Sequence, residues 1–121
     1  MEKPHKKLEV WKLAMEVAED IYKLTEKFPS PEKFGLVSQM RKSSVSIPSN
    51  IAEGAARNTK KEFINFLHIA QGSLSELDTQ IELSKRLGYI DESDWITIEN
   101  KLIQEDKMLS GLIKSQKVVK K

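Results

Sequence analysis

Apolar residues recur at steps of three and four along four stretches of this 121-residue chain. This spacing places apolar side chains on one face of an α-helix, and no segment shows the strict alternation of a strand. It predicts four helices, at about residues 8–27, 32–55, 60–87 and 92–115. Helices of this length joined by short connections predict one domain over residues 1–121. We expect an all-α fold, an antiparallel up-and-down four-helix bundle.

Helix ends are marked by residues with known local preferences. Pro29 ends the first helix, because proline lacks the amide hydrogen that a helix interior needs. Thr59 and Glu62 form a capping box at the start of the third helix. Gly88 is placed to take the left-handed conformation that closes this helix, and Asp91 is placed to cap the fourth.

One core position of the fourth helix is polar. Glu105 falls on the apolar seam between Leu102 and Leu109. A carboxylate is rarely buried without a partner. Glu105 therefore marks either a polar gap in the core or a contact between subunits.

The second helix contains weak helix formers in the stretch SVSIPSNIAEGAAR, which spans Ser44–Arg57. Pro48 removes one backbone donor, and the small residues let another backbone approach closely. A separate polar face recurs at helical spacing: Gln39, Ser43, Ser46, Asn50, Glu53 and Arg57. Two interpretations remain. The face packs against a helix or a second subunit, which the spacing favours, or it binds a ligand or partner.

Charge is nearly balanced overall, with a net charge of +2, but it is unevenly distributed. Residues 91–106 contain six acids and one lysine, whereas residues 107–121 contain five lysines and no acid. Residues 33–61 contain one acid and six cations, which are the candidate nucleic-acid contacts: Lys33, Arg41, Lys42, Arg57, Lys60 and Lys61. Such segments bind anions or simply form solvated faces, and charge patterning alone favours solvated faces.

No catalytic or metal-binding pattern is present. The chain has no cysteine, and His68 has Ile64 and Gly72 one helical turn away, neither of which is a ligand. Glu2 and His5 match the Glu-x-x-His spacing of di-iron bundles, but Pro4 lies between them and no second copy exists. It lacks a nucleophile elbow, a phosphate-binding loop and a dinucleotide glycine motif. We therefore expect no enzyme activity, no catalytic residue, no cofactor and no small-molecule substrate. Without a signal-like run or a membrane span, the expected location is the cytoplasm.

Several short motifs along the chain resemble one known family. They include LEVW at residues 8–11, FGL at 34–36 and LGY at 87–89, and the most specific is SIPSNIAEG at 46–54. In this order and spacing they resemble the four-helix-bundle family of the 23S rRNA intervening-sequence proteins. The accessory variability determinant proteins of diversity-generating retroelements are similar. The resemblance implies a homopentamer, and the similar retroelement proteins bind a reverse transcriptase and nucleic acid.

Two functional hypotheses follow. The first is a non-enzymatic, self-assembling adaptor whose oligomer presents basic residues to RNA, to DNA or to an enzyme that acts on them. The second is a purely structural or protein-binding oligomer without nucleic-acid contact. The net charge of +2 means that the first hypothesis depends on assembly to gather the lysines on one rim.

Overall fold

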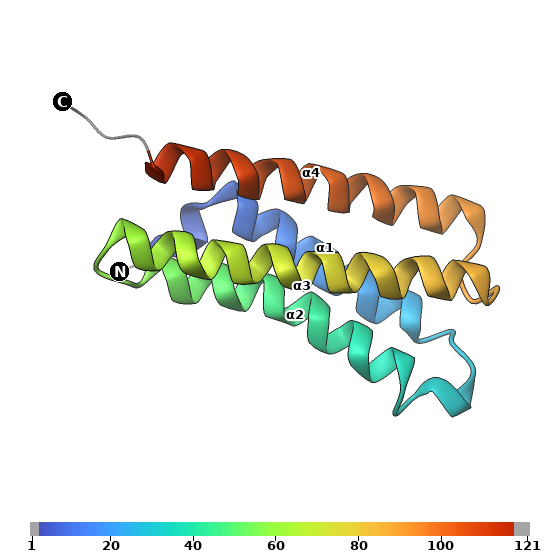
Figure 1. Cartoon of the computed structure of the whole chain (residues 1–121). Helices are drawn as coiled ribbons and strands as arrows, with labels where there is room; N and C mark the ends of the chain where they lie inside the picture. The colour runs from blue at the N-terminus through green and yellow to red at the C-terminus, as the bar shows by residue number, and fades with distance from the viewer. Residues whose placement is uncertain (1–2, 118–121) are drawn as a thin grey trace.

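The computed structural model describes residues 3–117 and confirms the predicted all-α bundle (Figure 1). Four long helices make up most of it: α1 (Glu9–Thr25), α2 (Leu36–Ala55), α3 (Lys60–Arg86) and α4 (Glu92–Lys117). Two short 3-10 helices precede α1 and α2, η1 (Pro4–Lys7) and η2 (Ser30–Glu32). No strand occurs in the described range.

The helices pack in a ring of neighbours. Helix α1 contacts α2 and α4, and α3 also contacts α2 and α4, so each helix lies beside two others. Figure 1 shows α2 and α4 on opposite sides, with α1 and α3 between them. The α1–α2 side of the bundle is therefore opposite the α3–α4 side.

The core lies where the four apolar faces meet. Its completely buried side chains come from all four helices at the predicted spacing: Ala14, Val17, Ile21, Met40, Ile47, Ile51, Leu67, Ala70, Leu77, Ile81 and Leu109. Burying a side chain of leucine size contributes about 1.5–3 kcal/mol. Between residues 3 and 117, no helix has the length and apolar content needed to cross a membrane.

Three predicted helix ends have the expected geometry. The Thr59 hydroxyl accepts a hydrogen bond from the backbone amide of Glu62 at 3.1 Å. Gly88 has a φ of 81°, in the left-handed region that glycine adopts at low cost. The Asp91 carboxylate accepts a hydrogen bond from the backbone amide of Asp94 at 2.8 Å.

The start of α2 differs from the prediction. The helix begins at Leu36 instead of residue 32, because Gly35 has non-helical angles of φ −111° and ψ −106°. The preceding 3-10 turn folds onto the α3–α4 connection. There the Tyr89 hydroxyl donates to the Glu32 carboxylate at 2.9 Å, and the Phe28 and Tyr89 ring centroids lie 5.2 Å apart.

Candidate functional site

The middle of the predicted polar face on α2 contacts α3. The buried Ser43 hydroxyl donates to the Glu76 carboxylate at 2.7 Å, and the hydroxyl oxygens of Ser46 and Ser73 lie 2.8 Å apart. The Asn50 amide donates to the Ser46 carbonyl at 2.8 Å and to its hydroxyl oxygen at 3.0 Å. Ser43 and Ser46 therefore join α2 to α3 within one chain, whereas both hydrogen bonds of Asn50 stay within α2. Whether the face also meets a second subunit stays a prediction.

The two ends of that face are open to solvent. Gln39 is exposed. At the other end, Arg57 forms an ion pair with Glu53 at 3.4 Å, and its guanidinium lies 4.9 Å from the centre of the Phe66 ring. Exposed ion pairs contribute about 0–1 kcal/mol each. The polar face is thus closed in its middle and accessible at its ends.

Gly54 marks the closest approach of α2 to α3. A Cβ atom at this position would lie 2.7 Å from the Phe66 Cβ and 2.9 Å from a Phe63 ring carbon. Such distances are too short for real contacts, so only glycine fits here without a shift of α3. Within the SIPSNIAEG segment, Gly54 therefore serves the packing of α2 against α3 inside the bundle.

The structure separates the six predicted cations into two groups. Helix α2 has 20 residues and is about 30 Å long, and it separates Lys33 from Lys61. The first group lies in a depression of about 510 Å³ between α1 and α2, which we call the aromatic groove. Its lining residues are Tyr22, Lys33, Phe34, Val37, Ser38, Arg41, Lys42 and Val45.

The second group lies at the end of the bundle where α1 and α3 begin and α2 and α4 end. Arg57, Lys60 and Lys61 flank the α2–α3 turn, and η1 and the last turn of α4 add further lysines there. We call this region the basic end. Its exposed cations are Lys3, Lys6, Lys7, Arg57, Lys60, Lys61, Lys114 and Lys117. Lys120 and Lys121, which sequence analysis placed with the basic tail, lie outside the described residues.

An acidic depression of about 240 Å³ lies between α3 and α4, and we call it the acidic groove. Its lining residues are Leu74, Ser75, Asp78, Glu99, Leu102, Ile103, Asp106 and Lys107. Burial raises the pKa of the Glu99 carboxyl to about 7, and the hydrogen bond and negative charge of Asp78 add to this effect. Glu82 also raises this pKa, and Lys85 lowers it.

Glu105 is completely buried in the bundle core. Neither of its carboxyl oxygens has a hydrogen-bond partner among residues 3–117. Burial raises its pKa to about 8, so the carboxyl is mostly neutral at pH 7. The sequence left two interpretations of Glu105, a polar gap in the core or a contact between subunits. The structure supports the first, because the side chain is buried within one chain.

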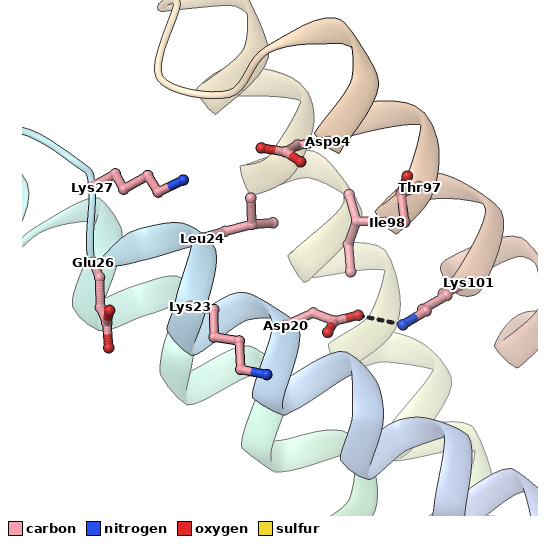
Figure 2. Close-up of a pocket in the computed structure, with 9 residues that line it drawn as sticks. All are labelled: Asp20, Lys23, Leu24, Glu26, Lys27, Asp94, Thr97, Ile98 and Lys101. Atoms are coloured by element: carbon pink, nitrogen blue, oxygen red, sulfur yellow. Dashed lines mark hydrogen bonds and ion pairs between the residues drawn. The ribbon is translucent and has the colours of Figure 1, made fainter.

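A further pocket of about 390 Å³ lies between α1 and α4 (Figure 2). Asp20 and Lys101 point toward each other across it, with 2.6 Å between the carboxylate oxygen and the ammonium nitrogen. The hydrogen bond that Lys101 donates to the Asp20 carboxylate raises the pKa of Lys101. The other charged lining residues are of both signs, and Figure 2 shows Glu26 pointing away from α4. This pocket therefore contains an ion pair that joins two helices.

Sequence reasoning did not find either groove as a unit. The acid-rich segment 91–106 was visible, but its partner Asp78 comes from α3, 21 residues away from Glu99. The FGL motif at residues 34–36 contains Phe34, but nothing in its sequence indicates that this ring is exposed. In the described part of the chain, no three His, Cys, Asp or Glu side chains are placed to hold a metal ion.

Fold and surface together define a small all-α bundle protein with charged grooves on two opposite sides. The family model described as 23S rRNA-intervening sequence protein matches residues 6–111, and the chain belongs to this family. A similar crystal structure is that of a protein of unknown function from the S23 ribosomal protein family, from Bacteroides thetaiotaomicron. It shares 30% identity at a TM-score of 0.80, over 87% of this chain and 95% of that one. No curated protein matches the sequence.

Proposed function

We propose that this protein is a non-enzymatic, self-assembling adaptor whose oligomer presents the basic end to nucleic acid, alone or bound to an enzyme that acts on it. The observation that carries the proposal is the gathering of eight exposed cations at one end of the bundle. Four acids lie close to them in sequence, and three of these already have partners: Glu9 pairs with Lys12, Glu53 pairs with Arg57, and Glu62 caps α3.

Assembly supplies the charge that one chain lacks. A single copy has a net charge of +2, which is weak for a nucleic-acid binder. A cyclic assembly places the same end of every copy on one rim, because all copies are related by one rotation axis. The family resemblance implies five copies, and five basic ends on one rim form a strong phosphate-binding surface.

Filter binding of labelled single-stranded RNA and DNA to the full chain, across a range of salt concentrations, tests this function. We expect affinity to fall steeply with salt, and Lys60→Glu with Lys61→Glu to weaken binding about tenfold or more. Lys23→Glu with Lys27→Glu is the matched control, since it makes the same charge change at the other end of α1. Binding without salt dependence, or equal loss in both variants, would contradict the proposal.

One observation favours the alternative of a structural or protein-binding oligomer. Two of the six predicted cations already have partners inside the chain. Arg41 donates to the Thr25 hydroxyl at 3.0 Å and to the Tyr22 carbonyl at 3.2 Å, and Arg57 pairs with Glu53. If the wild-type oligomer forms but does not retain RNA or DNA at low salt, this alternative holds.

A further inference from the structure

The aromatic groove and the acidic groove lie on opposite sides of the bundle and are complementary in charge. The first lies between α1 and α2 and the second between α3 and α4. The aromatic groove is lined by three cations and no acid, and the acidic groove by three acids and one lysine. A surface on one copy therefore matches the opposite surface on another.

The aromatic groove has an exposed apolar centre. Phe34 is 90% exposed, and Tyr22 and Val45 are each more than 40% exposed. A large aromatic ring left in water is an unusual surface feature, and in oligomers such residues anchor interfaces. The cost of exposing Phe34 disappears when a partner covers it.

The cations around Phe34 are arranged to meet an anionic partner. Arg41 is fixed by its hydrogen bonds to Thr25 and Tyr22, and its guanidinium stacks 4.5 Å from the centre of the Tyr22 ring. Lys33 and Lys42 are exposed and enter none of the ion pairs among residues 3–117. Two lysine ammonium groups thus remain available next to the exposed ring.

The acidic groove offers the matching features. Ile103 is 49% exposed at its centre, between Glu99 and Asp106 on the same face of α4. One carboxyl oxygen of Glu99 is buried without a hydrogen-bond partner in the described range. Its carboxyl neighbour Asp78 raises the local negative charge. A cation from outside the chain would satisfy these groups.

We propose that the aromatic groove of one copy docks onto the acidic groove of a second copy, with Phe34 against Ile103 and Lys33 and Lys42 facing Asp78, Glu99 and Asp106. This inference rests on the self-assembly in the proposed function and specifies the two surfaces that meet. Because the surfaces differ and lie on opposite sides, the contact is head-to-tail. Head-to-tail contacts build closed rings or open filaments, and a ring leaves the basic end of each copy on one rim.

Two charge-reversal variants of the full chain test the docking. Variant A carries Lys33→Glu and Lys42→Glu, and variant B carries Asp78→Lys and Asp106→Lys. Sedimentation velocity and circular dichroism are measured on each variant and on an equimolar mixture. We expect each variant alone to be helical and monomeric, because its two grooves then have the same sign of charge. The mixture should assemble again, with copies of A and B alternating. In that assembly the intact acidic groove of A meets the intact aromatic groove of B, and the two reversed grooves meet each other with opposite charges.

A control separates this inference from the nucleic-acid function. Lys60→Glu with Lys61→Glu changes the same charge at the basic end and is expected to keep the wild-type oligomer while binding less RNA. Phe34→Ala, which changes no charge, is expected to weaken assembly about tenfold or more.

Four outcomes would overturn the docking. Variants A and B assembling as wild type, or a mixture that stays monomeric while wild type assembles, would show that other surfaces meet. A variant A that keeps the wild-type oligomer but loses RNA binding would assign the aromatic groove to nucleic acid. A wild-type chain that is monomeric at all concentrations would refute self-assembly itself.

Discussion

The contact between α2 and α3 and the packing of α4 are built in different ways. At the α2–α3 contact, Gly54 removes the space between the helices, and Ser43 and Ser46 both have hydrogen-bond partners on α3. On α4, polar atoms of three side chains are buried without a partner among residues 3–117: Trp95, Glu99 and Glu105.

This difference indicates which helix contacts raise the free energy of unfolding and which lower it. Each buried polar group without a hydrogen bond costs about 1–3 kcal/mol. Among residues 3–117, Gln80 on α3 is the fourth side chain of this kind. Because three of the four belong to α4, we expect α4 to open at a lower free energy than α2. The acidic groove includes residues from α4, so the proposed docking of a second copy would cover part of this helix.

Replacing Glu105 should produce the largest change. The pKa of Glu105 is about 8 in the folded chain, above its usual value of 4.5. Between pH 4.5 and pH 8 the folded chain therefore keeps a proton that the unfolded chain has released. Stability should therefore fall as pH rises from 4.5 to 8 and stay low above 8. Glu105→Leu removes this loss, and we expect a gain of about 4 kcal/mol at pH 9.

Urea unfolding at pH 5 and pH 9 measures this effect. The gain at pH 5 should be smaller, because Glu105 is neutral there in the folded chain. Gln104→Leu, at the exposed neighbouring position, should show the pH dependence of wild type. A Glu105→Leu variant with the same pH dependence as wild type would show that this carboxyl does not control it.

Adding one carbon at Gly54 should give the next largest effect. Gly54→Ala places a methyl group against Phe63 and Phe66, and we expect a loss of about 2 kcal/mol from overpacking. Gly72→Ala is the matched control, because its Cβ meets nothing within 4 Å and alanine favours the helix by about 1 kcal/mol. Thermal unfolding should separate the two variants in opposite directions. Similar shifts of the melting temperature in Gly54→Ala and Gly72→Ala would argue against a tight α2–α3 contact.

Removing the Ser43 hydroxyl should have the smallest effect of the three. Ser43→Ala breaks the hydrogen bond to Glu76, and we expect a loss of about 1 kcal/mol, because water can still reach that carboxylate. Ser49→Ala, at an exposed position of the same helix, should change stability by less than about 0.5 kcal/mol. If Ser43→Ala and Ser49→Ala change the free energy of urea unfolding equally, the hydrogen bond from Ser43 to Glu76 does not contribute to stability.

Much of the fold follows from local sequence patterns. Helical periodicity depends only on neighbours within one or two turns, so the seam from Phe63 to Ile81 predicts α3 directly. The Thr59 cap and the Gly88 turn are equally local. The start of α2 was not predicted, because the pattern does not show that Gly35 adopts non-helical angles. It also does not show that Tyr89 reaches Glu32 from another part of the chain.

The candidate site was less predictable, because it depends on which helices are neighbours. Spacing placed Ser43, Ser46 and Asn50 on one face but could not name α3 as the helix that Ser43 and Ser46 contact. The basic segment 33–61 is continuous in sequence, yet its two ends lie about 30 Å apart along α2. Glu105 was recognisable, since a carboxylate on an apolar seam is visible from spacing alone.

Native-state hydrogen exchange of the full chain at pH 7 and pH 9 tests the contrast between the α2–α3 contact and α4 most directly. Opening free energies are obtained for the amides of residues 43–54 on α2 and 98–109 on α4. We expect the α2 amides to open only with global unfolding at both pH values. The α4 amides should open at lower free energy, and more easily at pH 9, where Glu105 ionises. Equal opening free energies for both segments at both pH values would contradict the account.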